Sequence, residues 1–568
     1  MELSLVPFST LSLPLAAIVL PVFAVILLCY LNFFYVDCAK INGIPEIPGG
    51  ELLAGHLYQL GNDHATTAET WAAKYGWPVF QLRMGRRRAV FLNSFGAARE
   101  WLVKNQSSTV DRPWFHTFHG VVSKTSGMQS IEFVLIYGQV LTSDQAATIG
   151  TSPWNDRTKK QRRVVGSFTT GPAMQKMRDM LDVETCAVIS GLLHNGKQGS
   201  VNIIPHMYYK RMALNLMTMF CYDFRFNSVH DPLLLQILQD AKTIASFRST
   251  NSNPQDFIPH LRYTGRSSRT EIAAEVRARR DKWLAAMLDE ISGRLKSDHS
   301  SSKKTIGRKC VAELLLEDSQ EGLTQLDIKT ILGGLMSGGF ETVFSTAIIA
   351  TGVLSTPQGQ EIQQRAFDDI LSVYDSPEQA FELCVTEEKS PYVTALVKET
   401  LRCYPPHKIL PARQVYRDFE YNGVTVPKGV LIYVNNQAVN FDEEAYGADA
   451  REFRPERWIK AAHEIPNPNH FAFGAGARMC TAVNFSNRVL YAVLLRLILS
   501  FKIRQSRDMP PNVDFIDYKD DPAASNAVAS DFKVTCEPRD EDVLRRCLEK
   551  TRNQSSESGR QDAEVFLK

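Results

Sequence analysis

Hydrophobic and polar positions change their pattern along the chain in a way that separates an N-terminal segment from a large body. Residues 3–36 contain no charged side chain, and the run from Leu11 to Tyr35 is long and apolar enough to cross a bilayer as one helix. Basic residues before this run and a small-residue cleavage site after it are absent, so an uncleaved anchor is favoured over a signal peptide. No later stretch reads as apolar enough to span, which predicts a single crossing.

The body contains two kinds of hydrophobic pattern, one helical and one strand-like. From about residue 157 to 400 the periodicity is mainly helical, and the segments 271–295 and 324–354 are the longest helical candidates. Short strand-like runs lie at 78–82, 89–92, 424–426 and 430–434, and a last long helix is predicted over 482–501. The pattern predicts a mainly α fold with small β-sheets.

Domain boundaries follow from these changes. We expect an N-terminal membrane anchor over 1–36 and a hinge over 37–50, where prolines stiffen the chain and glycines allow a turn. One large domain is expected over 51–550, followed by a polar, disordered tail over 551–568.

Charge and cysteine content exclude several classes of protein. The 568 residues include 64 Lys and Arg against 62 Asp and Glu, a net charge of +2, which gives no electrostatic case for nucleic acid. The ten cysteines form no CxxC pair and match neither a disulfide framework nor a zinc site. Most cysteines are therefore expected to be buried small side chains, with one or two carrying chemistry.

One cysteine lies in an informative loop. In the segment FGAGARMCTA, two glycines permit a tight turn and Cys480 then stands at the start of an apolar helix. A helix N-terminus is expected to lower the pKa of this thiol and to favour the thiolate, the form that binds iron. Arg478 is placed to pair with a carboxylate. The alternative is a glycine turn with an incidental buried cysteine.

This loop resembles the haem-binding loop of the cytochrome P450 family, FxxGxRxCxG, with Ala482 at the last glycine position. The resemblance implies a cytochrome P450 fold preceded by one N-terminal transmembrane helix. It also implies haem b with Cys480 as the axial ligand of iron, Phe473 packed over the sulfur, and Arg478 at a haem propionate.

Two further motifs match the family in the expected order. Glu399 and Arg402 lie at i and i+3 on one helix, and Arg457 follows in a segment shortly before the cysteine loop. Alone, the first pair is weak, because such pairs occur on many helices. By resemblance, the three residues form a buried structural charge network on the thiolate side, a role that suits the forked guanidinium of arginine.

A third motif lies inside the apolar helix predicted over 324–354. Gly338 and Gly339 each cost about 1 kcal/mol relative to alanine in a helix, so a close approach by a flat cofactor or a local widening of the helix is expected. Glu341 and Thr342 match the acid–alcohol pair of the family, which would relay protons to iron-bound dioxygen. The alternative is a packed helix with a solvated glutamate.

Two more arginines are candidates for the haem propionates by resemblance. Arg413 lies where the family has an arginine after the ExxR helix. Arg162 takes the arginine of a WxxxR pattern, although Thr158 replaces the tryptophan. The basic cluster around Arg162 equally fits a surface for an acidic redox partner or a solvated face.

The resemblance implies a monooxygenase that inserts one atom of dioxygen into a C–H bond. No dinucleotide fingerprint is present, so electrons are expected from a separate protein. By resemblance, this donor is an NADPH-dependent flavin reductase on the same membrane, with a cytochrome b5 as a second donor. The expected place is the endoplasmic reticulum membrane, crossed once, with the catalytic domain on the cytosolic side.

Three segments, 111–119, 149–154 and 247–253, resemble the fungal phenylacetate-hydroxylase branch, whose relatives oxidise small phenols such as m-cresol. Phe115 and Phe118 would stack on a small ring, or are ordinary core aromatics. Residues 128–146 stand as an insertion relative to that branch and are either a substrate loop or an artefact of the gene model.

These features predict hydroxylation of a small aromatic or phenolic substrate in fungal secondary metabolism. Four alternatives are open. The first three are phenylacetate-type aromatic catabolism, a haem-thiolate isomerase or dehydratase, and a non-catalytic, membrane-anchored haem-binding or scaffold protein. A protein that binds no haem at all is the fourth.

Overall fold

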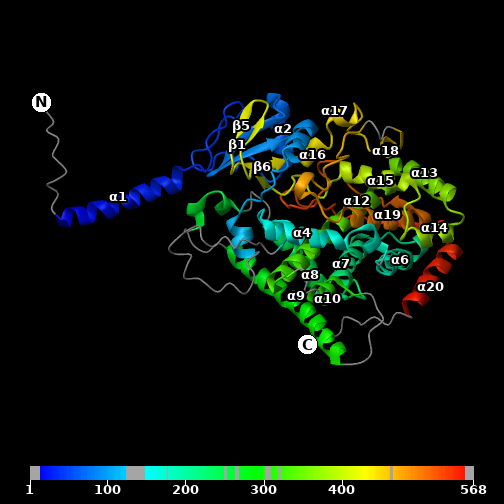
Figure 1. Ribbon diagram of the computed structural model, residues 1–568. Helices are drawn as coiled ribbons and strands as arrows, with labels where there is room; N and C mark the ends of the chain where they lie inside the picture. Colours follow the sequence, from blue (N-terminus) through cyan, green and yellow to red (C-terminus); the bar gives the residue numbers. More distant parts are fainter. Residues whose placement is uncertain are drawn as a thin grey trace.

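The computed structural model describes residues 13–122, 148–175, 177–247, 253–262, 268–300, 309–317, 322–460 and 465–556. The segment 128–146 lies outside these ranges, so its role as a loop or an artefact stays a prediction. Most of the body is a stack of helices, with small sheets on one side and a single helix projecting from it (Figure 1). The predicted mainly α fold with small sheets is confirmed.

The main helices are α1 (Leu13–Phe34), α2 (His64–Tyr75), α4 (Asp156–Phe168), α6 (Arg178–Asn195), α7 (His206–Tyr222), α8 (Pro232–Ser246), α9 (Ser268–Ser300), α10 (Val311–Glu317), α11 (Gln325–Gly339), α12 (Glu341–Ser355), α13 (Pro357–Val373), α14 (Pro377–Leu383), α15 (Pro391–Cys403), α19 (Val483–Ser500) and α20 (Glu541–Ser556). Shorter helical turns are α3 (Phe95–Arg99), α5 (Gly171–Gln175), α16 (Asn436–Val439), α17 (Glu443–Tyr446) and α18 (Arg457–Lys460). The largest apolar core lies among α6, α7, α12 and α19, and α12 is buried along almost its whole length.

The strands form three small sheets. The largest has the order β1 (Val79–Met84), β2 (Arg87–Leu92), β6 (Leu431–Val434) and β3 (Arg413–Gln414). Strands β2 and β6 are parallel, with Val90 opposite Ile432, although they are far apart in sequence. The other two sheets are β4 (Phe419–Tyr421) with β5 (Val424–Val426), and β7 (Phe501–Gln505) with β8 (Val534–Pro538).

The apolar helix expected over 324–354 is divided in two. Helix α11 ends at Gly339 and α12 begins at Glu341, with Phe340 between them. The two glycines destabilise a continuous helix here, and their surroundings differ. A Cβ at Gly339 would collide with the thioether of Met217 on α7, whereas a Cβ at Gly338 would meet no atom within 4 Å. Gly339 is therefore needed for helix packing, and Gly338 leaves open space.

Segment 37–50 is not a free hinge. The side-chain amide of Gln81 on β1 donates to the carbonyl oxygens of Ile41 and Ile44 at 2.7 and 2.6 Å. Glu46 pairs with Arg88 of β2, and Ile41 and Ile44 are buried. These partners lie some 40 residues away, so a composition of prolines and glycines did not reveal that the segment packs against the first sheet.

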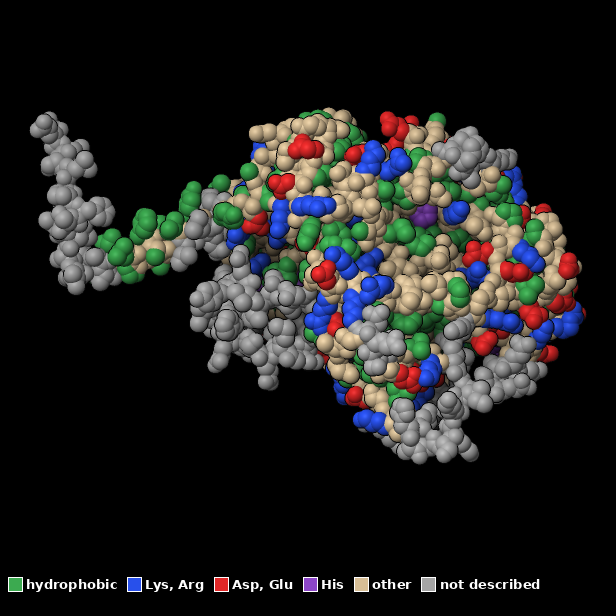
Figure 2. Space-filling model, in the orientation of Figure 1, with side chains coloured by type: hydrophobic (Ala, Val, Ile, Leu, Met, Phe, Trp, Pro, Cys, Tyr) green, Lys and Arg blue, Asp and Glu red, His purple; other side chains and the backbone are tan. Residues whose placement is uncertain are grey.

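Helix α1 has 22 residues and stands clear of the body, and the apolar side chains from Ile18 to Leu27 are exposed (Figures 1 and 2). The expectation that no other segment is apolar enough to span was wrong by composition, because Gln325–Ser355 and Val483–Ser500 also have the length and hydropathy. Their apolar windows are 67% and 72% buried, so both are helices of the core. At the other end α20 extends through Ser556, so residues 551–556 of the expected tail are helical.

Candidate active site

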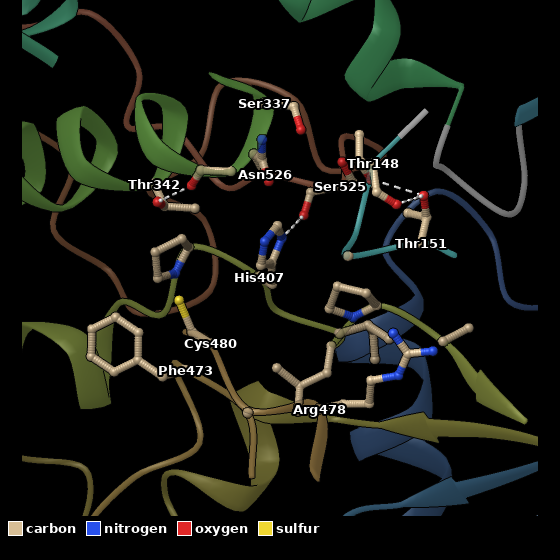
Figure 3. Close-up of a pocket in the computed structure, with 18 of the residues that line it drawn as sticks. Thr148, Thr151, Ser337, Thr342, His407, Phe473, Arg478, Cys480, Ser525 and Asn526 are labelled. Carbon is tan, nitrogen blue, oxygen red and sulfur yellow. Dashed lines mark hydrogen bonds between the residues drawn. The ribbon is translucent and has the colours of Figure 1, made fainter. Parts of the chain in front are cut away.

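A chamber of about 410 Å³ lies in the middle of the body, where the cysteine loop faces the junction of α11 and α12. Its walls also include the segment 406–413, which follows α15, and the loop 522–526 (Figure 3). Cys480 lies on one side, with Thr342 and Asn526 on the opposite side. Of the cysteines that the structure describes, Cys480 alone lines this chamber.

The cysteine loop adopts the tight turn that its glycines predict. Gly474 and Gly476 have φ of 67° and 62°, and a Cβ at Gly476 would strike the carbonyl oxygen of Leu102. The backbone N–H of Cys480 donates to the carbonyl oxygen of Phe473 at 2.9 Å, which closes the loop. Cys480 thereby presents its sulfur to the chamber just before α19.

The sequence predicts a lowered pKa for Cys480, and this prediction is wrong for the protein without a bound metal, where the pKa is raised. The backbone N–H of Ala482 does donate to Sγ at 3.4 Å, and this contact and Arg162 both favour the thiolate. Burial outweighs them and raises the pKa of Cys480. Deprotonation therefore calls for a stronger positive charge beside the sulfur, which a metal ion supplies.

Four arginines gather at one end of the chamber. Arg162 on α4 donates to the carbonyl oxygen of Met479 at 2.6 Å, and Arg413 on β3 donates to that of Ala475 at 2.6 Å. Arg478 donates to the carbonyl oxygens of Val110 and Ser152, at 2.8 and 2.6 Å. The fourth, Arg112, was not predicted; it donates to the carbonyl oxygens of Gly150, Pro411 and Ala412.

Among the described residues, no carboxylate forms a salt bridge with these four arginines. Burial lowers the pKa of Arg112 to about 10, with a further contribution from Arg162, although Asp111 acts in the opposite sense. Burial and the neighbouring guanidinium groups also hold the pKa values of Arg413 and Arg478 well below their usual range. The Nη1 atom of Arg413 is buried and has no hydrogen-bond partner among the described residues. Such a cluster fits an anionic group, and two carboxylates of one cofactor would meet that need.

The three residues of the predicted charge network do not line the chamber, and the structure brings them together. Arg402 donates through Nε and Nη2 to both oxygens of Glu399, at 2.9 and 2.8 Å, and both residues are fully buried. Nε of Arg457 lies 3.5 Å from the same carboxylate, and the indole of Trp458 donates to it at 2.9 Å. Arg402 also donates to the carbonyl oxygens of Asn440 and Ala450, so the network joins α15 to the segment before the cysteine loop.

The acid–alcohol pair is divided between two sides of its helix. Thr342 lines the chamber, and its hydroxyl donates to the carbonyl oxygen of Gly338 at 3.0 Å. Glu341 is buried, which excludes a solvated glutamate, but it does not line this chamber. Its carboxylate instead accepts a hydrogen bond from the amide of Asn526, which does line the chamber (Figure 3).

Three aromatic side chains named in the sequence analysis line the chamber. Phe115 and Phe118 both line the chamber, and Phe115 packs against Phe257 with ring centroids 5.5 Å apart. Phe473 lines it beside Cys480. Two residues of the chamber, Arg112 and Asn526, were not predicted from the sequence. Arg112 lies in a segment noted for other reasons, with no partner in sequence to mark it, and Asn526 is brought to Glu341 from 185 residues away.

Comparison with known proteins identifies the class. The family model "Cytochrome P450" matches residues 139–516. The chain is 36% identical over 515 residues to "Phenylacetate 2-hydroxylase" of Emericella nidulans, covering 90% of this chain and 93% of that protein. It is 31% identical to "3-hydroxyphenylacetate 6-hydroxylase" of the same organism, covering 94% and 96%. The fold is similar to that of a zebra fish cytochrome P450 solved with progesterone, with a TM-score of 0.64 and 18% identity over 84% of this chain and 99% of that one.

The chain belongs to the cytochrome P450 family and is a monooxygenase. Membership implies a haem with a cysteine thiolate as axial ligand, and electrons from NADPH through a reductase. The chamber suits that group, because it joins one cysteine, an unbalanced arginine cluster and the open space beside Gly338.

Proposed function

We propose that this protein hydroxylates a small aromatic or phenolic substrate at a haem whose iron is bound by Cys480. The observation that carries the proposal is the chamber itself, where a single cysteine faces Thr342 and aromatic side chains while four arginines close one end. When bound, the haem supplies reductive activation of dioxygen and oxygen insertion, and the protein supplies the ligand, the protons and the position of the substrate.

The residues that would hold the haem follow from their placement. Arg112, Arg162, Arg413 and Arg478 would bind its propionates, and neutralisation by these carboxylates would remove the repulsion among the guanidinium groups. Phe473 would pack beside the sulfur of Cys480. Glu399, Arg402 and Arg457 do not line the chamber and would hold the cysteine loop in place.

Thr342 is the proposed proton donor of the chamber. Its hydroxyl is the alcohol of the acid–alcohol pair and lines the chamber. Glu341 does not line the chamber and would act indirectly, through its hydrogen bond with Asn526 in the chamber wall. We expect Thr342→Ala to continue consuming NADPH while product per NADPH falls by about 100-fold, because proton transfer by a positioned group is worth at least that factor. Ser345→Ala, which removes another hydroxyl of α12, is the control, and both products and NADPH are measured. Unchanged coupling in Thr342→Ala would count against the relay.

A small aromatic substrate is supported by the relatives and by the lining. The two Emericella nidulans proteins are named for hydroxylation of phenylacetate and of 3-hydroxyphenylacetate. Phe115 and Phe118 offer ring faces in this chain. Asn526 offers a hydrogen-bond acceptor, because its amide N–H faces Glu341 while its Oδ1 is buried with no partner among the described residues. A phenolic hydroxyl would satisfy that oxygen.

Asn526 therefore gives a specific expectation about substrate choice. We expect Asn526→Ala to weaken binding of m-cresol by about tenfold and to leave binding of toluene, which lacks the hydroxyl, within about twofold. The measurement is the substrate-induced shift of the haem Soret band. Ser525→Ala on the same loop is the matched control. Equal weakening for both ligands would show that Asn526 only supports the wall.

The physiological role is proposed from the same relationships. We infer a role in fungal secondary metabolism, with aromatic catabolism as the second candidate, because relatives named for phenylacetate are compatible with both. Incubation with phenylacetate, m-cresol and m-hydroxybenzyl alcohol tests the substrate class. An oxygenated product from at least one supports it, and no product from any of them would contradict it.

Membrane attachment and the redox partner complete the proposal. Helix α1 would reach about 33 Å, enough for a bilayer core, and its exposed apolar side chains would lie in lipid. The catalytic domain would face the cytosol on the endoplasmic reticulum, where an NADPH-dependent flavin reductase and a cytochrome b5 could reach it. Lys159 and Arg163 are exposed on α4 and suit an acidic partner.

A further inference from the structure

A second chamber of about 340 Å³ lies between α8, α9 and α11, beside the haem chamber. Its walls are mostly apolar, with Ile237, Leu288, Met336 and Phe340 among them. Phe118, Thr148 and Ser337 line both chambers, so only side chains separate the two spaces. Its volume is within the range of small-molecule sites.

Two buried polar atoms in this apolar wall have no partner among the described residues. Asp240 is fully buried, and its Oδ1 accepts hydrogen bonds from Gln236 at 3.0 Å and from Arg279 at 3.0 and 2.9 Å. Its other oxygen, Oδ2, accepts none, and the indole N–H of Trp283 donates none. Both residues line the chamber. A buried donor or acceptor without a partner is destabilising, so a pair of them in one chamber points to a missing occupant.

The chemistry of these two atoms defines the ligand. The charge of Asp240 is already paired with Arg279, so Oδ2 calls for a neutral donor rather than a cation. The indole of Trp283 is a donor only, and a hydroxyl group both donates and accepts. The apolar walls and the rings of Trp283 and Phe340 suit an aromatic body.

We propose that the second chamber binds a phenol of the substrate class, with its hydroxyl donating to Asp240 Oδ2 and accepting from Trp283 Nε1. This inference rests on the proposed function for the choice of a small phenol. The side chain of Glu341 lines the second chamber and holds Asn526 in the wall of the haem chamber. Occupancy of the second chamber is thereby connected to the position of a residue that faces the substrate.

The test is the stoichiometry of m-cresol binding to the haem-loaded full chain, measured by calorimetry alongside the Soret shift. The wild type is expected to bind two molecules per haem, only one of which shifts the Soret band directly. Trp283→Phe keeps the ring but removes the N–H, and is expected to weaken the second site by about tenfold. Ala241→Phe fills the chamber from α8 and is expected to abolish that site, while Trp77→Phe, outside both chambers, is the control.

The outcomes separate this inference from the proposed function. One m-cresol per haem in the wild type, with a normal Soret shift and product, would overturn the second site alone and would leave a water molecule as its occupant. Two sites that persist in both Trp283→Phe and Ala241→Phe would also overturn it. No Soret shift and no product from m-cresol would instead contradict the proposed substrate class.

Discussion

Replacing Cys480 with serine is expected to abolish product formation, with a loss of about 100-fold or more. Even the outer-shell partners of a bound metal typically contribute 10–100-fold, and Cys480 is the proposed ligand itself. A serine hydroxyl is a far weaker anion than a thiolate and would not donate the electron density that favours O–O cleavage. The measurement is product formed per mole of chain, in membranes with reductase and NADPH supplied.

A matched control separates ligation from a general effect of the substitution. Cys38→Ser makes the same chemical change at a half-buried cysteine outside the chamber, where Sγ donates to the carbonyl oxygen of Lys428 at 3.5 Å. We expect Cys38→Ser to retain activity. Retained activity in Cys480→Ser would refute the assignment of the ligand.

The second large effect is expected on stability, from Arg402→Leu. This change would leave the fully buried carboxylate of Glu399 without its bidentate partner and would unpair the carbonyl oxygens of Asn440 and Ala450. Removing one partner of a buried ion pair typically costs about 3–5 kcal/mol. We therefore expect a lower midpoint of urea unfolding and a smaller haem-loaded fraction, both measured on purified protein.

The contrast for this prediction is an exposed ion pair of similar spacing. Arg545 pairs with Glu541 at i and i+4 on α20, with side chains 51% and 41% exposed. Exposed pairs of this kind contribute roughly 0.3–0.5 kcal/mol, so Arg545→Leu should barely move the unfolding midpoint. Equal effects of the two substitutions would show that burial of the Glu399–Arg402 pair does not set its contribution.

Local signals in the sequence sufficed where neighbours in sequence are also neighbours in space. The turn closed by Phe473 and Cys480, the pair of Glu399 and Arg402, and the entry into α19 each include a contact within a few residues. The turn and the start of the helix were therefore predictable from spacing and residue type, whereas the charge pair was assigned by its resemblance to the cytochrome P450 family. The helices and strands followed for the same reason.

Long-range contacts decided what the sequence could not reveal. Glu341 and Thr342 are adjacent, yet the partner of Glu341 is Asn526 on a distant loop, so their separate orientations had no local signal. Burial of Cys480 by elements from the whole chain reversed the expected shift of its pKa. Gln81 likewise binds segment 37–50 to the first sheet through hydrogen bonds to Ile41 and Ile44. The composition of that segment indicates only a stiff turn.

The central claim is that Cys480 binds the iron of a haem in this chamber. Carbon-monoxide difference spectroscopy of reduced membranes tests it most directly, with wild type and Cys480→Ser prepared in parallel. The wild type is expected to show the band that thiolate ligation gives, and Cys480→Ser is expected to lack it. A wild type without that band, or a band unchanged in Cys480→Ser, would contradict the claim.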